Sequence, residues 1–328
     1  MKIEKDVLLK DKNWFYTGGY TNFFCRPTTP KEFVQAVLFA KKRNLTVEIL
    51  GEGANVLISD DGYNGLIISP FLNTISIEGG TSIVTVGAGR TIQNTIDWCL
   101  DNGITGLEEF SGIPGTIGGA VYINIHYFQF FLSNFLIKAQ VLDRVTDEIV
   151  CVDKNWFEFG YDTSKLQEKR HILISATFAL NRSNTLDVAY AQGRRDEIIR
   201  QRNSRYPMAR TCGSFFKNFD ENIATGKPPF VAYYLDKLGI KGDLRFGDAI
   251  VSHRHANMIV NQGNATSQDI ITLARKMQEL VFDNFGLIPQ TECQLIGFTK
   301  FPLHTEKTLI ARSRPAKYDL DTQPLTEP

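Results

Sequence analysis

Residues 111–121 read Ser-Gly-Ile-Pro-Gly-Thr-Ile-Gly-Gly-Ala-Val, and the interpretation of this chain starts from that stretch. Four of the nine residues from Gly112 to Ala120 are glycine, and the same run holds a proline and a threonine. Glycine adopts positive φ easily and lets a flat or anionic ligand approach the main-chain amides. The alternative is a long structural loop. The two isoleucines within the run favour a loop that is pressed against another part of the protein.

Two shorter glycine-containing segments precede this stretch, each after an expected strand. Residues 51–57 read Gly-Glu-Gly-Ala-Asn-Val-Leu and follow a strand expected over 46–50. Residues 87–90 read Gly-Ala-Gly-Arg and follow a strand expected over 82–86. Both start like a dinucleotide-binding fingerprint, but each lacks the third glycine, and no helix is expected after the first. A lone Gly-x-Gly is more often a tight turn, so neither segment by itself predicts a nucleotide site.

The bulk composition indicates a globular protein with more than one core. A chain of 328 residues is too long for one small core and fits two domains or one large two-lobed unit. Its 36 basic and 36 acidic residues balance, so neither nucleic acid nor an anionic membrane surface is expected as a partner. An anionic substrate therefore needs a local basic site.

Neither a membrane anchor nor a disulfide framework is expected. The most apolar segment, residues 121–136, is interrupted by polar side chains, and residues 1–13 hold no run long enough for a signal region. The five cysteines are scattered and form no Cys-x-x-Cys pair, which argues against disulfides and a zinc site. No cluster of metal ligands and no nucleophile elbow is present. The simple interpretation is a protein of the reducing cytoplasm.

Helical and strand patterns alternate and predict a mixed α and β fold. Thr29 and Glu32 form a capping box, with Pro30 at the first helical position, at the start of a helix expected up to residue 43. Helices are also expected over 92–103, over 186–205, from about 235, and from Thr266 or Ser267 to 285, with strand over 249–260. The arginine-rich helix over 186–205 places the domain junction near residue 200. The expected division is 1–200, 201–300 and a loosely held, proline-containing tail over 301–328.

The glycine-rich segments are followed by further motifs in a fixed order. These are Phe159-Gly-Tyr161, Gly213-Ser-Phe-Phe-Lys-Asn218, Leu238-Gly-Ile-Lys-Gly242, the segment from Val251 to Asn261, and Glu292 ahead of Leu295-Ile-Gly297. The ordered set resembles the UDP-N-acetylenolpyruvoylglucosamine reductases over roughly residues 18–297. The resemblance implies an α+β protein with a two-lobed FAD-binding domain of the vanillyl-alcohol-oxidase type and a C-terminal α+β substrate domain.

The same resemblance implies the cofactors and the reaction. NADPH reduces FAD, and the reduced flavin converts UDP-N-acetylglucosamine enolpyruvate to UDP-N-acetylmuramate for peptidoglycan synthesis, in a cytoplasmic monomer whose partner is the UDP-sugar. The FAD pyrophosphate is then held by loop amides rather than by a Rossmann turn. The implied FAD-binding residues are Gly51, Gly53, Ala54, Asn55, Val56, Leu57, Gly87, Gly112, Ile113, Pro114, Gly115, Thr116, Gly118, Gly119, Ala120 and Asn124.

The catalytic residues are also implied by position. Ser214 matches the family's proton donor, and Glu292 matches the glutamate that holds or protonates the intermediate. Taken alone, Ser214 is a turn residue and Glu292 a solvated strand end. The implied substrate-binding residues are Tyr161, Lys217, Asn218, His255 and Asn257. The arginines of the helix 186–205 have the ordinary interpretation of a solvated face, except Arg202, whose register matches an arginine of the family.

The chain departs from the family pattern in two places. Asp162 stands where the family commonly has the arginine that clamps the substrate carboxylate. We expect Lys165 to replace that arginine as a point charge. The run from Asn124 through His126 to Phe128 replaces a usual Asn-Ala-Gly-Ala-Tyr-Gly and should alter the wall of the flavin pocket. His126 is either a proton-active neighbour or a packed core histidine, and the second is favoured.

The departure at Asp162 leaves two other functions open. One is a catalytically impaired homologue that binds flavin or a sugar nucleotide. The other is a flavin oxidase on the same fold.

Overall fold

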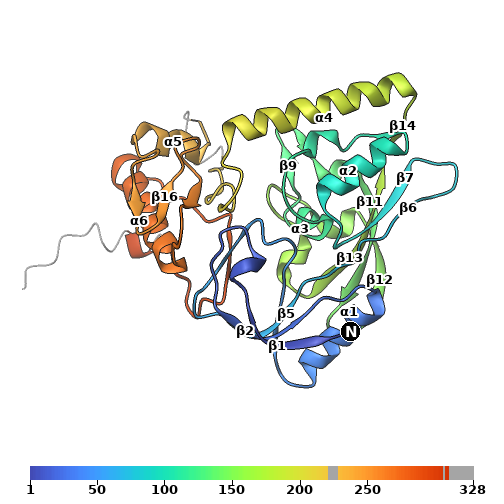
Figure 1. Ribbon diagram of the computed structural model, residues 1–328, viewed down its shortest axis with the longest axis horizontal. Coiled ribbons are helices and arrows are strands. Elements are labelled where there is room, and N and C mark those ends of the chain that lie inside the picture. The colour runs from blue at the N-terminus through green and yellow to red at the C-terminus, as the bar shows by residue number, and fades with distance from the viewer. Residues whose placement is uncertain (221–227, 306, 310–328) are drawn as a thin grey trace, which may run out of the picture.

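The computed structural model describes residues 1–220, 228–305 and 307–309. Figure 1 shows a small sheet with helix α1 near the N-terminus, a larger sheet with α2 and α3, and a C-terminal part with α5 and α6. The long helix α4 runs from the second part to the third. Strands and helices are mixed throughout the chain, so the expected α+β class is confirmed.

The first part is a four-stranded sheet covered by one helix. Its strands lie in the order β1-β2-β5-β3, with β1 antiparallel to β2 and the other pairs parallel. Thr29 caps α1 by accepting a hydrogen bond from the Glu32 amide at 3.2 Å. The Glu32 carboxylate accepts from Thr28 instead of closing the expected capping box. The bounds are β1 Ile3–Leu8, β2 Tyr20–Cys25, α1 Pro30–Lys41, β3 Thr46–Ile49 and β5 Tyr63–Ile68.

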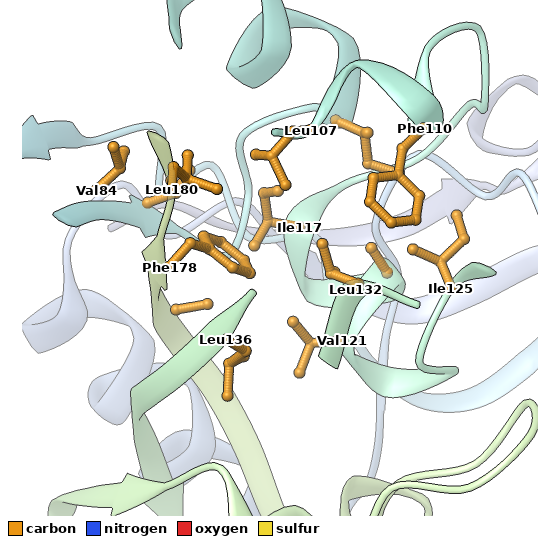
Figure 2. Packing of buried hydrophobic residues seen from close by; sticks show 14 of the residues in the cluster. Val84, Leu107, Phe110, Ile117, Val121, Ile125, Leu132, Leu136, Phe178 and Leu180 are labelled. Carbon is orange, nitrogen blue, oxygen red and sulfur yellow. The ribbon is translucent and has the colours of Figure 1, made fainter. Parts of the chain in front are cut away.

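The second part is a five-stranded antiparallel sheet in the order β12-β11-β13-β7-β6. Figure 2 shows its core, in which Ile117 and Val121 of α3 lie near Phe178 and Leu136. The bounds are β6 Ile75–Ile77, β7 Ile83–Gly87, α2 Ile92–Asp101, α3 Ile117–Tyr122, β11 Leu136–Asp143, β12 Ile149–Asp153 and β13 His171–Ala179. Two short antiparallel pairs flank it, β8 Ile104–Thr105 with β14 Asn181–Arg182, and β9 His126–Tyr127 with β10 Phe130–Phe131.

The third part follows α4, of which only Ala191 and Ile198 are buried. A three-stranded sheet packs on α5 and α6 around a separate apolar core. The chain then returns to the first part, because the last strand pairs in parallel with β4. The bounds are β4 Val56–Ile58, α4 Thr185–Arg205, α5 Val231–Lys237, β15 Arg245–Phe246, β16 Ala249–Val251, β17 Ile259–Asn261, α6 Ser267–Phe285 and β18 Gln294–Ile296.

Two sequence predictions about helices were wrong in detail. Helix α5 begins at Val231, four residues before the expected start. The glycine-rich stretch holds α3, although adjacent glycines disfavour a helix. Tertiary contacts compensate: Thr116 caps the helix, and the Gly118 amide donates to the Ala88 carbonyl at 2.8 Å. A short helix therefore forms directly behind the expected ligand-binding loop.

The start of the expected loose tail is packed rather than free. Leu303 is buried in the C-terminal core, and the His304 amide donates to Gln278 of α6 at 3.0 Å. Residues 306 and 310–328 lie outside the described residues. Among those that are described, no helix is long and apolar enough to cross a membrane, and no group of three metal-ligand side chains is found.

Candidate functional site

Two adjoining cavities lie between the three parts of the molecule. The first has a volume of about 210 Å³ and the second about 360 Å³. They share the wall residues Ala54, Asn55, Pro114, Ile123 and Ile125. A long ligand in the first cavity therefore presents one end to the second.

The first cavity is lined by the glycine-rich segments. Gly53 has φ +67°, and a Cβ there would lie 2.5 Å from the Lys12 carbonyl oxygen. A Cβ at Gly51 would lie 2.7 Å from Thr116 Oγ1. These glycines are therefore required for close chain packing that shapes the cavity. The predicted cofactor-binding residues that line it are Gly51, Gly53, Ala54, Asn55, Val56, Pro114, Gly115, Thr116, Gly118, Gly119 and Ala120.

The residues of the first cavity fit FAD. Within the described part of the chain, neither amide atom of the Asn55 side chain has a hydrogen-bond partner, although both atoms are buried. An unsatisfied buried polar group costs about 1–3 kcal/mol, so a ligand with donors and acceptors is favoured there. Gly115 has φ +128°, and a Cβ there would meet nothing within 4 Å, which leaves its backbone open to a close ligand. The site thus offers the loop cradle and the polar group that a flavin nucleotide needs.

The second cavity brings together side chains from distant segments. Ser214, Asn218 and Glu292 come from the C-terminal part, and Tyr161 comes from the loop before β13. The backbone pairing explains the meeting of Ser214 and Glu292. Ser214 pairs with Met258, and the Glu292 amide donates to the Phe215 carbonyl at 2.9 Å.

Asn257 supports this arrangement from outside the cavity lining. Its Nδ2 donates to the Phe216 carbonyl at 2.7 Å, and its Oδ1 accepts from the Phe216 amide at 3.1 Å. Both ends of the buried amide are thus used to hold the segment that carries Ser214. The structure places Asn257 as a positioning residue and does not bring it to the cavity as the expected substrate ligand.

Glu292 has the electrostatics of a proton carrier. Burial and, after it, the charge of the nearby Asp162 raise the pKa of its carboxyl to about 8, with Lys217 opposing both effects. The group is therefore mostly protonated at neutral pH. Such a carboxylic acid donates a hydrogen bond or a proton to an anion that forms beside it.

Tyr161 and Asn218 form a polar pair at the cavity. Asn218 Nδ2 donates to the Tyr161 hydroxyl oxygen at 2.9 Å. Burial, and next to it the charge of Asp162, raise the pKa of Tyr161 to about 12. The phenol therefore stays neutral and keeps its proton as a hydrogen-bond donor.

Asp162 lines the second cavity as a buried residue. Its residue is 5% exposed and has φ +54°. His126 Nδ1 lies 3.5 Å from Asp162 Oδ1, and the imidazole stacks on the ring of Phe131. Burial raises the pKa of Asp162 and lowers that of His126, while each opposes the shift of the other. A carboxyl–imidazole pair thus occupies the place of the expected arginine.

Lys165 is not among the residues that line either cavity. Its ammonium forms an ion pair with Glu158 and lies 5.6 Å from the centre of the Trp156 ring. The structure therefore gives no support to Lys165 as the replacement for the arginine. Lys217 is the lysine whose charge acts on both Asp162 and Glu292.

Two further basic side chains line the second cavity. Arg202 makes no salt bridge within the described chain, and it lies over the rings of Tyr127 and Tyr206 at 5.8 and 5.2 Å. Burial lowers the pKa of Arg202, and it lowers the pKa of His255 to about 4. Arg202 is thus a cation able to meet an anionic ligand, and His255 contributes a neutral imidazole.

The remaining predicted residues lie in other places. Gly112 and Ile113 line the second cavity rather than the first. Leu57 is fully buried in the C-terminal core, and Gly87 belongs to β7. The Asn124 side chain donates to the Gly160 carbonyl at 3.0 Å and accepts from the Ser133 amide at 3.1 Å. Asn124 therefore holds the loop that carries Tyr161 and does not line the cofactor cavity.

Sequence reasoning missed the far wall of the first cavity. Arg144 lines it directly after β11, Lys169 from the turn before β13, and His171 from the first position of β13. No motif marks these residues, because they reach the cavity only through pairing of strands that are far apart in the chain. Cys212 was also missed as a residue of the second cavity.

Comparisons with known proteins agree with this geometry. A family model described as "FAD binding domain" matches residues 21–150, and the C-terminal domain of UDP-N-acetylenolpyruvoylglucosamine reductase matches residues 204–296. The reductase of Caldicellulosiruptor bescii is 31% identical over 91% of this chain and 92% of its own. That of Exiguobacterium sibiricum is 34% identical over 90% of this chain and 95% of its own.

A solved structure extends the likeness to three dimensions. The crystal structure of UDP-N-acetylenolpyruvylglucosamine reductase from Thermus caldophilus matches with a TM-score of 0.75 at 26% identity, over 90% of this chain and 99% of that chain. The expected two-lobed FAD-binding domain with a C-terminal α+β domain is thereby confirmed. The chain therefore belongs to the family of UDP-N-acetylenolpyruvoylglucosamine reductases, which are FAD-dependent oxidoreductases.

Proposed function

We propose that this protein reduces UDP-N-acetylglucosamine enolpyruvate to UDP-N-acetylmuramate, with NADPH as the electron source, in peptidoglycan synthesis. The observation that carries the proposal is the meeting of Ser214 and Glu292 in a cavity that adjoins the FAD cavity. The chemistry supplied by bound FAD is hydride transfer, from NADPH and then to the enolpyruvyl double bond. The protein's own residues bind the substrate and supply the proton.

Hydride addition leaves negative charge on the carbon that bears the carboxylate, and one proton must reach that carbon. Ser214 donates this proton from its hydroxyl and regains one from solvent. The protonated carboxyl of Glu292 donates a hydrogen bond to the developing enolate. Tyr161, Lys217, Asn218 and Arg202 are proposed to bind the polar and anionic groups of the sugar nucleotide.

An anaerobic titration tests the function. NADPH should bleach the visible flavin absorbance, and UDP-N-acetylglucosamine enolpyruvate should restore it, whereas UDP-N-acetylglucosamine should not. A flavin that is reduced but not reoxidised by the enolpyruvate would indicate the catalytically impaired homologue. Rapid reoxidation by dioxygen alone would indicate an oxidase. The departure at Asp162 is the observation that keeps the impaired homologue as the second candidate.

The domain boundaries, the oligomeric state and the cellular location are also proposals. We propose domains over 1–200 and 201–300, supported by separate apolar cores on either side of α4. The outline of two family domains over 21–150 and 204–296 is compatible with this division. A cytoplasmic monomer is proposed, and sedimentation of the purified protein tests the oligomeric state.

A further inference from the structure

Asp162 creates an electrostatic problem in the second cavity. Its carboxyl lines the same cavity as Glu292, its charge raises the pKa of Glu292, and the charges of both carboxyls raise the pKa of Tyr161. A substrate carboxylate would be a third acidic group there. Carboxyl groups crowded in a poorly solvated site repel one another unless a cation or proton is added. A positive group next to Asp162 relieves this repulsion.

His126 is the group in position to supply it. Nδ1 lies 3.5 Å from Asp162 Oδ1 and is buried without a hydrogen-bond partner in the described chain. The ring lies between Phe131 and Tyr161, with centroids at 5.1 and 4.5 Å, which fixes its orientation. His126 itself lines the cavity. Because Nδ1 faces Asp162, Nε2 is the ring nitrogen that can meet a ligand.

We propose that His126, oriented by Asp162, binds the substrate carboxylate through Nε2 and takes the place of the arginine that the family pattern has at position 162. This inference rests on the proposed function. It also explains why the two departures occur together. Position 126 is a glycine in the family pattern. The imidazole of His126 fills the space beside Asp162, whose side chain is shorter than the family's arginine and has the opposite charge.

Carboxylate binding is then coupled to proton uptake. In the free protein burial lowers the pKa of His126, so the ring is largely neutral at neutral pH. A bound carboxylate adds a second negative neighbour and favours the imidazolium form. One proton passes from solvent to the ring as the ligand binds. Affinity therefore falls as the pH rises.

Other charged groups around His126 set the pH at which this happens. The charge of Asp162 favours the imidazolium. The other charged groups of this region are Glu292 in the same cavity, Lys217, whose charge acts on Asp162, and Arg202, which lies over the Tyr127 ring. The phenol of Tyr161 stays neutral because its pKa is raised to about 12.

Calorimetry of the oxidised FAD-loaded protein tests the proposal. UDP-N-acetylmuramate carries the carboxylate, and UDP-N-acetylglucosamine lacks it. Titrations in two buffers of different ionisation enthalpy should show proton uptake only with the muramate. His126→Gln should abolish the uptake and weaken the muramate about tenfold to a hundredfold, while changing the affinity for UDP-N-acetylglucosamine by less than about twofold. The exposed His253→Gln is the matched control and should change neither.

A restored pair sharpens the test. Asp162→Arg alone should bind the muramate poorly, because His126 occupies the space. Adding His126→Gly should recover the affinity without proton uptake. Unchanged muramate binding in His126→Gln, or uptake that persists in it, would overturn the proposal while leaving the proposed function intact. Binding of neither nucleotide by the unmodified protein would overturn both.

Discussion

The first cavity follows the pattern of the family, and the second cavity departs from it. One wall of the first comes from two contiguous segments within residues 51–56 and 114–120, where glycines allow close approach. The second is built from side chains of several distant segments. A main-chain cradle accepts few substitutions at its tightest positions, because a Cβ at Gly53 would lie 2.5 Å from the Lys12 carbonyl oxygen. In a site built from side chains, a single charged group can be replaced by a pair of groups, as the family's arginine is by His126 and Asp162.

Gly53→Val should have the largest effect, because its Cβ would meet the backbone of Lys12 and Asn13 at 2.5 and 2.6 Å. We expect loss of bound FAD and a destabilisation of about 3 kcal/mol or more. Flavin absorbance per protein and thermal unfolding measure both. Gly79→Ala is the control, since a Cβ there meets nothing within 4 Å. A Gly53 variant that keeps its flavin would show that the first cavity does not depend on main-chain packing.

Glu292→Gln should mainly affect turnover. We expect kcat to fall by about 10² to 10⁴, with flavin reduction by NADPH unchanged. In the unmodified enzyme the substrate step should slow as the pH rises through about 8, because the carboxyl loses its proton there. The glutamine variant should lack this limb of the pH profile. If both proteins slow equally as the pH rises through about 8, a group other than Glu292 is responsible for the pH dependence.

The same carboxyl affects stability with a defined sign. The folded pKa of Glu292 lies above the ordinary value of 4.5, so the native state holds more protons than the unfolded state between about pH 4.5 and 8. Its contribution to the free energy of unfolding therefore falls as the pH rises through this window. The free energy of unfolding of Glu292→Gln, taken relative to that of the unmodified protein at the same pH, should therefore be higher at pH 8 than at pH 5. Denaturant unfolding at the two pH values measures this difference.

Asn257→Ala should have a smaller effect, on stability first. It leaves the amide and carbonyl of Phe216 without their partners, at a cost of about 2 kcal/mol. Chemical denaturation measures this cost. If Asn257 binds substrate instead, KM should rise while the midpoint of unfolding stays unchanged.

Lys165→Ala should have the smallest effect. The side chain is partly exposed and pairs with Glu158 outside both cavities, so kcat/KM should stay within about twofold of the unmodified enzyme. Steady-state kinetics with varied sugar nucleotide check this. A loss of a hundredfold or more would restore Lys165 as the carboxylate ligand and contradict the role of His126.

More of the first cavity than of the second could be predicted from the sequence. The cofactor-binding residues of 51–56 and 114–120 were found because contiguous motifs in a fixed order carry the resemblance to the family. Asn124 and Asn257 were assigned to ligands, but both turn their amides to backbone groups. A local pattern shows that an asparagine is present and does not show which group it meets.

The sequence by itself determined the α+β class, the glycine-rich cofactor loop and the identity of Ser214 and Glu292 as candidates, because each depends on local spacing or on an ordered set of motifs. Only the tertiary structure decided which cation can face the substrate carboxylate. It placed Lys165 outside both cavities and His126 beside Asp162. The reason is physical: residues 126 and 162 meet only after a hairpin and a loop pack together, and no spacing along the chain records that contact.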